Sequence, residues 1–351
     1  MSYLKKSWEK EKQKEEIPRE ILEKMGARGS FVTVKTDRLF KELDEKIQSE
    51  SYSKQGLDIV EQINEKTAEI YYTTWINNLT ENLPTIKQDN NISEIQKWKR
   101  KTAIIIGAGP SFKEKKHIEF LKKNNDKTII STDRMLIPLL KEGVEPDFVV
   151  SLDGLEIISQ FYDDPLVNKN ISTQAIMSVT VSPSLIKRFP NKIYFYTPML
   201  DTIEKPISVT NTISQLTKTS VIASGGNVGI TCINIAYYLG YKNILFTGMD
   251  QGYTSKEEIG KSSHYLDIKE EDSTMTLDKY MELFITEGYN PDFDIKYYTD
   301  LAWKPQIDTF IERSTIIAKN GVNLINTTGG GALHGGGIVG MSLGEALKKY
   351  D

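Results

Sequence analysis

The amino-acid sequence predicts an α/β fold, a Rossmann-like and mostly parallel sheet with helices on both faces. Three observations lead to this prediction. From about residue 99 onward, short runs of β-branched and aromatic residues alternate with segments of helical periodicity. Most of these runs are continuously apolar, as expected of strands that are buried on both faces. Glycines or acidic residues follow several of the runs, where the ligands of such sheets bind.

Seven segments have the composition of strands, and four longer ones place apolar residues at helical spacing. The predicted strands cover residues 102–107, 127–132, 146–152, 174–180, 192–197, 243–248 and 322–327. The predicted helices between them cover residues 115–124, 133–143, 227–241 and 304–321, and the last should stop at Asn320-Gly321. Because parallel strands end at one edge of a sheet, the loops after them are the expected ligand site.

The chain divides into two regions of different composition. Residues 1–98 are rich in Lys, Glu, Gln and Asn, and segments 36–50 and 56–79 repeat apolar positions every three or four residues. We predict a helical N-terminal region at 1–98 and an α/β nucleotide-binding domain at 99–351. Within that domain, residues 252–320 precede the last strand and are expected to form a helical lid insertion.

The composition of the chain argues against a nucleic-acid-binding, a disulfide-rich and a membrane-spanning protein. The 351 residues carry a net charge of -4, so the basic surface of a nucleic-acid-binding protein is not expected. Cys232, the single cysteine, lies in an apolar helical segment, which predicts an inert core thiol and excludes an intramolecular disulfide. The sequence shows neither a secretory segment nor a run of roughly 18 apolar residues, so we expect a cytoplasmic protein without a membrane span. The oligomeric state stays open.

The first predicted strand runs into a glycine turn. Gly107 and Gly109 allow a tight turn and close approach of backbone to a ligand, Pro110 suits a first helical turn, and Ser111 adds a hydroxyl. Free N–H groups at the start of the next helix would favour an anion there. Phe112 replaces the third glycine of a dinucleotide fingerprint. The alternative is a plain strand-to-helix turn that needs glycine for steric reasons.

A second glycine turn opens the apolar helix at 227–241. Ser224, Gly225, Gly226 and Asn227 combine a hydroxyl, flexible backbone and an amide at a helix N-terminus, which would make a second anion cradle. A capped helix with a flexible turn is the simpler alternative. Two such cradles in one sheet favour a phosphate that is carried by a nucleotide.

Three acidic residues follow predicted strands. Asp133 stands where nucleotide-binding sheets often place the acid that binds ribose, although it could equally be the N-cap of the next helix, with Ser131 or Thr132 sharing that role. Asp153 follows the third strand without a second acid beside it, so a paired-acid magnesium site is not indicated. Asp250 follows Gly248 at the end of the sixth strand and could orient a nucleotide or act as a base.

The three histidines fall in different settings. His264 and His334 lie in predicted edge loops, where each could act as an acid or base. His117 lies among lysines and is expected to be solvated on a charged helix face. The candidate catalytic residues are therefore His264, Asp250 and Asp153.

Four blocks of the sequence carry a likeness to a known family. In order, they are AIIIGAGPS, EPDFVVSLD, SGGNVGITCINIAYYLGYKNILFTGMD and GVNLINTTGGG. Over roughly residues 70–340 they resemble the MptE-like superfamily. One branch contains archaeal 6-hydroxymethyl-dihydropterin pyrophosphokinases. The other contains the motility-accessory-factor (Maf) flagellin glycosyltransferases, whose core is similar to CMP-sialic acid transferases.

Details of the sequence favour the Maf branch. The pyrophosphokinases carry a Thr-Asp-x-Asp-Gly block, where this chain offers Asp153 alone, and a His- and Asp-rich segment, where 177–198 has no histidine or acid. TENLPTIKQ, PDFVVSLD and NLINTTGGG are similar to Maf segments, but the long extra regions of Maf proteins are missing here. The resemblance implies that Asp250 and His264 match the strand-end acid and following histidine of that branch. It also implies a nucleotide-sugar site lined by Gly107, Gly109, Ser111, Ser224, Gly226 and Asn227.

Three hypotheses of function follow. The first is a glycosyltransferase that moves a nonulosonic sugar from a CMP-activated donor to a protein or glycan hydroxyl, with a flagellin as one kind of acceptor. It needs no resident cofactor, because the nucleotide sugar is a co-substrate. The second is a 6-hydroxymethyl-dihydropterin pyrophosphokinase that uses ATP and magnesium. The third is a non-catalytic nucleotide-binding or assembly module.

Overall fold

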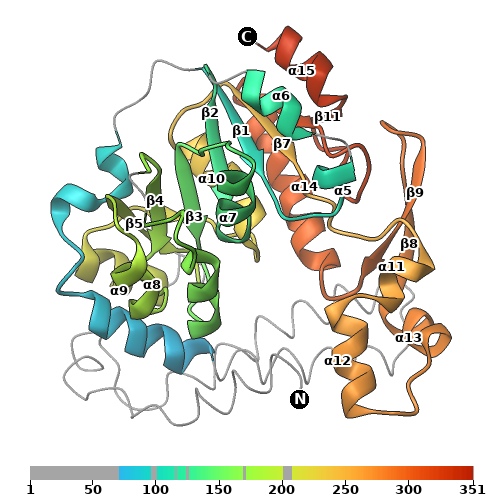
Figure 1. Ribbon diagram of the computed structural model, residues 1–351, viewed down its shortest axis with the longest axis horizontal. Coiled ribbons are helices and arrows are strands. Elements are labelled where there is room, and N and C mark those ends of the chain that lie inside the picture. Colours follow the sequence, from blue (N-terminus) through green and yellow to red (C-terminus); the bar gives the residue numbers. More distant parts are fainter. Residues whose placement is uncertain are drawn as a thin grey trace.

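The computed structural model describes residues 71–95, 101–114, 117–123, 126–168, 171–200 and 208–350, and the predicted helix at 36–50 lies outside these ranges. Within them, nine strands form one sheet in the order β11-β10-β7-β1-β2-β3-β4-β5-β6, and all neighbouring strands pair in parallel (Figure 1). The predicted α/β fold is thereby confirmed. The strands are β1 (Thr102–Ile106), β2 (Thr128–Thr132), β3 (Phe148–Ser151), β4 (Gln174–Ser178), β5 (Ile193–Pro198), β6 (Val221–Ile222), β7 (Asn243–Thr247), β10 (Asn323–Asn326) and β11 (Ile338–Gly340).

Strand order reverses at β1, and this reversal determines where a ligand site can form. From β1 the chain adds β2 to β6 on one side, and it then returns to place β7, β10 and β11 on the other side. The carboxyl ends of β1 and β7 therefore form the topological switch point, where sheets of this class bind ligands. Both strands are completely buried, so the switch point rests on a rigid support.

Alternate residues of the strands pack against different helical layers. Ile105 faces the cluster that includes Ile230 of α10 (Val228–Tyr238) and Phe310 of α14 (Lys304–Lys319). Its neighbour Ile104 faces the cluster that includes Leu139 of α7 (Asp133–Lys141). Helices cover both faces, which is why the strands read as continuous apolar runs. The remaining helices of these layers include α5 (Ser111–Glu114), α6 (His117–Lys123), α8 (Pro183–Arg188), α9 (Val209–Thr217) and α15 (Leu343–Lys349).

The described part of the N-terminal region is a helix over residues 71–82, and it docks on the loops after β3 and β4. The amide of Asn78 donates to the carbonyls of Gly154 and Thr180, and the amide of Asn82 donates to the carbonyls of Val179 and Val181. Two short 3-10 turns follow, η1 (Gln88–Asn90) and η2 (Ile92–Glu94). The helix therefore forms part of the rim of the carboxyl edge.

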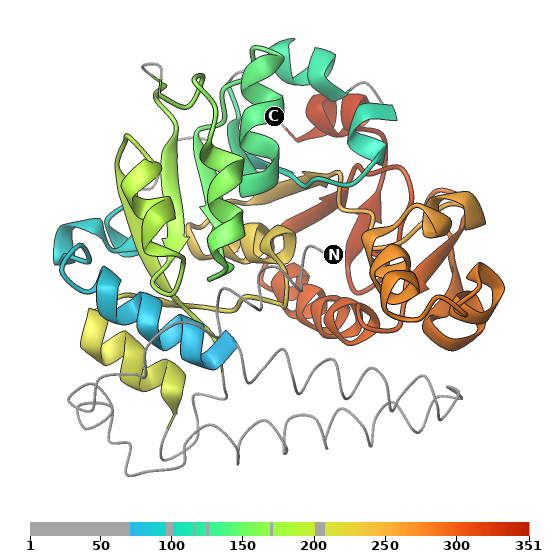
Figure 2. The same ribbon diagram turned by 60° about the horizontal axis from the view of Figure 1, so that its bottom comes forward.

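Residues between β7 and β10 build a separate layer that contains an unpredicted hairpin. After α11 (Lys256–Gly260), α12 (Ser263–Glu271) and α13 (Leu277–Phe284), the antiparallel strands β8 (Ile285–Asn290) and β9 (Ile295–Asp300) pair with each other. A bridge between Tyr253 and Tyr298 ties the hairpin to the loop after β7. This layer and the helix at 71–82 flank the sheet on opposite sides (Figures 1 and 2).

Two smaller predictions can be compared directly with the structure. Helix α14 ends at Lys319 with Asn320 as its C-cap, and Gly321 follows with a positive φ of 75°, so the predicted stop at Asn320-Gly321 is confirmed. Cys232 is fully buried in α10, so its assignment as a core thiol is confirmed. Burial also raises the pKa of this thiol well above its ordinary value, which keeps it protonated and unreactive.

Candidate functional site

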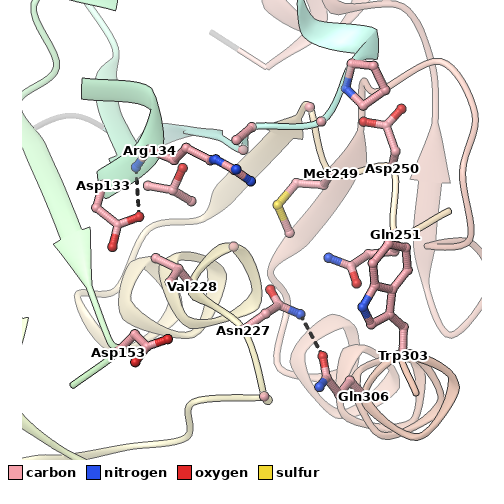
Figure 3. Close-up of a pocket in the computed structure, with 18 of the residues that line it drawn as sticks. Asp133, Arg134, Asp153, Asn227, Val228, Met249, Asp250, Gln251, Trp303 and Gln306 are labelled. Atoms are coloured by element: carbon pink, nitrogen blue, oxygen red, sulfur yellow. Dashed lines mark hydrogen bonds between the residues drawn. The ribbon is translucent and has the colours of Figure 1, made fainter. Parts of the chain in front are cut away.

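A cavity of about 810 Å³ lies at the carboxyl ends of β1, β2, β3 and β7 (Figure 3). One wall is formed by the loops after β2 and β3, and the opposite wall by the loop after β7 and the start of α14. Polar and aromatic side chains share this lining. Of the candidate residues chosen from the sequence, the cavity is lined by Gly107, Gly109, Pro110, Asp133, Asp153, Gly226, Asn227, Gly248 and Asp250.

The glycines after β1 allow the loop that follows this strand to pack closely against the loop after β7. The amide of Gly107 donates to the carbonyl of Thr247 at 2.9 Å, and that of Gly109 donates to the carbonyl of Gly248 at 2.8 Å. A Cβ atom on Gly109 would lie 1.7 Å from Oδ2 of Asp250. These two amides already have acceptors in the loop after β7. The structure thus supplies the steric reason for glycine that the sequence left open.

Ser111 supports the cavity from behind its wall. The Ser111 hydroxyl donates to Oδ2 of Asp250 at 2.9 Å, and Ser111 itself is not among the lining residues. Asp250 does line the cavity, so this hydrogen bond fixes the orientation of a carboxylate that a ligand would meet. The role of Ser111 is therefore to position Asp250.

The second glycine turn caps α10 and contributes only partly to the lining. Asn227 is the N-cap, and its Oδ1 accepts the amide of Ile230 at 2.9 Å, while its Nδ2 donates to Gln306 at 3.3 Å. Gly226 has a φ of 81°, a backbone conformation that favours glycine, and a Cβ atom there would displace the Gln306 side chain. Ser224 and Gly225 do not line the cavity. Asn227 therefore caps α10 and also lines the cavity, whereas the binding of an anion at this turn stays a prediction.

Asp133 is a buried carboxyl in the wall formed by β2 and α7. It is the first residue of α7 rather than the N-cap, a position that Thr132 holds, so the N-cap alternative is corrected. Its carboxyl accepts the amide of Arg134 at 2.7 Å and the hydroxyl of Ser151 at 3.1 Å. Burial, aided by the nearby charge of Asp153, raises its pKa from 3.8 to about 7. Asp133 can therefore exchange a proton close to neutral pH.

Asp153 lies at the end of β3 on the same side of the cavity. Its Oδ1 accepts the amide of Leu155 at 3.0 Å, and its side chain is only half-buried. Within the described ranges, no three or more His, Cys, Asp or Glu side chains come together as a metal site. The aspartates of the cavity are instead divided between its two walls, with Asp133 and Asp153 opposite Asp250 (Figure 3).

His264 contacts the wall of the cavity from outside. Its ring meets the Trp303 ring edge-on at 5.2 Å, and Trp303 lines the cavity in a stack with Tyr253 at 5.5 Å. The Nδ1 atom lies 3.3 Å from Oδ2 of Asp300, a buried carboxylate that also accepts the hydroxyl of Tyr280 at 2.8 Å. The Asp300 carboxylate raises the pKa of His264. This arrangement lets His264 orient Trp303.

Replacing His264 with alanine is expected to destabilise the protein more below pH 6 than at pH 8. The folded state holds the protonated ring through Asp300, so this stabilisation is complete below the unfolded pKa of 6.5 and disappears as pH rises through the folded pKa. The side chain is 41% exposed, so the effect should stay below about 1 kcal/mol. Urea unfolding of both proteins at the two pH values measures it, and an equal loss at both would contradict the expectation.

The other two histidines lie outside the cavity lining. His334 approaches the Tyr297 hydroxyl through Nε2 at 3.4 Å, and burial lowers its pKa. The expectation that His117 is solvated is wrong. It is 3% exposed, and its Nδ1 forms a hydrogen bond with the hydroxyl of Thr247 in β7. The lysines around it in the sequence concealed this burial.

Sequence analysis missed several residues that line the cavity. Arg134 points into it from the first turn of α7 (Figure 3), and Lys261 and Glu258 reach it from the insertion. Trp303 and Gln306 come from the start of α14, which was predicted only as an amphipathic helix. Arg134 could have been found, because it follows the candidate Asp133 directly after a strand. The others depend on how the insertion folds back.

The fold and the cavity define a Rossmann-like α/β protein with a ligand-sized site at the switch point of its sheet. In the described residues, no helix is long and apolar enough to cross a membrane. The chain belongs to the MptE-like family, because the family model described as 6-hydroxymethylpterin diphosphokinase MptE-like matches residues 77–256, slightly more than half of the chain. The resemblance found in the sequence is confirmed.

A similar solved structure is that of the MAf glycosyltransferase from Magnetospirillum magneticum AMB-1. The two share 18% identity with a TM-score of 0.56, over 84% of this chain and 43% of that one. The likeness shows a shared fold, and the present chain corresponds to less than half of the larger protein. None of the curated protein sequences compared with the chain matches it significantly.

Proposed function

We propose that this protein is a nucleotide-dependent transferase, a Maf-like glycosyltransferase that moves a nonulosonic sugar from a CMP-activated donor to a hydroxyl group. The observation that carries the proposal is the cavity of about 810 Å³ at the switch point between β1 and β7. Its volume is in the range of small-molecule sites, and its position is where sheets of this class bind nucleotides. Membership of the MptE-like family and the fold shared with a MAf glycosyltransferase support the same class.

Sugar transfer requires a group that accepts the proton of the acceptor hydroxyl. A base works best when its pKa lies near the working pH, which favours Asp133 with its pKa of about 7. Asp250 and Asp153 also line the cavity and can orient hydroxyl groups of the donor or acceptor. His264 would act on the reaction only through Trp303 in this arrangement, as a positioning residue.

Aromatic residues from the insertion and the rim give the site a second function, which is to bind flat or apolar parts of the substrate. Trp303 and Tyr253 stack on each other in one wall, and Tyr71 and Phe161 line another part of the cavity. Such rings can stack on a base or on a sugar face. The acceptor is a protein or glycan hydroxyl in this proposal, with a flagellin as one candidate.

The pyrophosphokinase alternative retains support from the family description. It requires ATP with magnesium, and the ion is commonly bound by one or two carboxylates together with the substrate phosphates. Asp153 and Asp250 are the candidates for this task, but they lie on opposite walls of the cavity. Asp133 is a poor ligand at neutral pH because its pKa is raised. For these reasons the transferase is the preferred proposal.

Calorimetric titration with CMP and with ATP, each with and without magnesium, tests the proposal. We expect CMP to bind without a metal. Binding of ATP that requires magnesium, in the absence of CMP binding, would favour the pyrophosphokinase and contradict the transferase. If neither nucleotide binds, a non-catalytic assembly module becomes the better explanation.

A further inference from the structure

Arg134 brings a positive charge into the cavity and forms no ion pair with a described residue. Its guanidinium projects from the first turn of α7 into the open space (Figure 3), and it lies over the Phe161 ring at 5.7 Å. Within the described ranges, no carboxylate lies within 4.0 Å of it. The adjacent Asp133 carboxyl is engaged by the Arg134 amide and by Ser151. Because the guanidinium of Arg134 has no ion-pair partner among the described residues, its five N–H donors can bind a ligand.

Thr132 provides a second, independent observation at the same place. It holds the N-cap position of α7, where threonine usually accepts an amide of the first turn, yet its side chain makes no such bond. The residue is 5% exposed and lines the cavity, and its hydroxyl has no hydrogen-bond partner among the described residues. A buried hydroxyl without a partner is costly, so a ligand atom is the natural partner for it.

The backbone of α7 favours a negative charge at this position. The helix has nine residues, and the first amides of a helix have no intrahelical acceptor and carry the positive end of its dipole. Asp133 uses one of them, that of Arg134. Because burial raises the Asp133 pKa, this carboxyl is largely uncharged below neutral pH and does not repel an anion there.

We infer that the first turn of α7 binds an oxyanion of the substrate, with the Arg134 guanidinium and the Thr132 hydroxyl as its main donors. The anion is either the phosphate of a nucleotide or the carboxylate of an acidic sugar, which share the same geometry toward arginine. The Gly107 and Gly109 amides already donate to backbone carbonyls at the end of β7 and in the loop after it, so these two amides are not available to the anion. The choice of ligands rests on the proposed function, but the anion site itself does not.

The test is calorimetric titration of four ligands into the wild type and three variants, Arg134→Gln, Arg134→Lys and Thr132→Val. Pyrophosphate probes the anion site alone, CMP adds a nucleoside, cytidine lacks the phosphate, and N-acetylneuraminic acid carries only a carboxylate. We expect Arg134→Gln to weaken anion binding by about tenfold or more and Thr132→Val by about two- to tenfold. Lysine should restore little, because it cannot form two parallel bonds. Cytidine binding should not change.

Arg188→Gln is the matched control, because it removes a surface arginine that pairs with Asp163 at 3.2 Å away from the cavity lining. It should bind all four ligands as the wild type does. A loss for CMP and pyrophosphate assigns the turn to phosphate, whereas a loss for N-acetylneuraminic acid alone assigns it to a carboxylate.

The outcomes separate this inference from the proposed function. If CMP binds and Arg134→Gln binds CMP, pyrophosphate and N-acetylneuraminic acid as tightly as the wild type does, the inference is wrong and the transferase survives. If pyrophosphate binding depends on Arg134 but no nucleotide binds, the anion site stands and the proposed function fails. If the wild type binds none of the four ligands, both are wrong.

Discussion

Replacing Gly109 with alanine is expected to lower the free energy of unfolding by about 3 kcal/mol, the upper end of the usual cost of overpacking. The added Cβ atom would lie 1.7 Å from Oδ2 of Asp250 and 2.7 Å from the carbonyl oxygen of Gly248. Asp250 can rotate away, but the carbonyl belongs to the backbone that accepts the Gly109 amide. Relief of the clash therefore requires the two loops of the switch point to separate.

The same substitution should weaken ligand binding as well as stability. Rotation of Asp250 breaks its hydrogen bond with Ser111 and moves a carboxylate that lines the cavity. Urea unfolding and calorimetric titration of the purified variant measure the two effects. They should appear together, because one displacement causes both.

Gly330→Ala is the matched control for Gly109→Ala. A Cβ atom at Gly330 would meet its nearest neighbour, the Ile295 side chain, at 3.4 Å, which is ordinary contact, and its backbone has no positive φ. Its free energy of unfolding should change by less than about 1 kcal/mol. Equal stability of the two variants would show that close packing of the β1 and β7 loops is not the reason for glycine at position 109.

The fold could be predicted from the sequence because its strands are buried on both faces. Short, continuous apolar runs such as 102–107 and 243–248 are typical of strands in a parallel sheet that is covered on both faces. All seven predicted strands are present. The short edge strands β6 and β11 were not predicted, because they lack a continuous apolar run of this kind. The hairpin β8–β9 was missed because neither ITEGYN nor IKYYTD shows a regular alternation of apolar and polar residues. Its turn also depends on Asp294 in a left-handed conformation.

The site was only partly predictable, and the reason is the long range of its contacts. Residues directly after strands, such as Asp133 and Asp250, were found because topology alone brings strand ends together. Trp303 reaches the cavity only because α14 begins there, after a layer whose path no local pattern specifies. The glycines were found, but their partners were not, since the contact between Gly109 and Asp250 joins residues far apart in the chain.

Replacing Asp133 with asparagine is expected to make the protein more stable than the wild type near pH 8 and to flatten the dependence of its stability on pH. In the wild type the carboxyl has a pKa of about 7 when folded and an ordinary value of 3.8 when unfolded. Between these values the folded state binds more protons than the unfolded state. Stability therefore falls as pH rises from about 4 to 7 and then levels off.

The full difference corresponds to roughly 4 kcal/mol between the low and high pH limits, as an upper value. Asparagine carries no charge at any of these pH values and keeps an oxygen for the amide of Arg134. Ser151 can accept a hydrogen bond from the new Nδ2 group, because its own hydroxyl can donate instead to its other partner, the Tyr162 hydroxyl at 2.7 Å. The substitution thus removes the charge while retaining the hydrogen bonds around it.

Urea unfolding near pH 5 and near pH 8 gives the change in the free energy of unfolding between the two pH values for each protein. The wild type and the variant are then compared by this change, in which the contribution of His264 cancels. Asp153→Asn provides a second variant, because removal of that neighbouring charge should lower the pKa of Asp133 and so weaken the pH dependence without abolishing it. An Asp133→Asn protein whose stability changes with pH as steeply as that of the wild type would show that the carboxyl is already ionised at low pH. In that case Asp133 would be excluded as the base near neutral pH. Asp250, which also lines the cavity, would then become the candidate for the base.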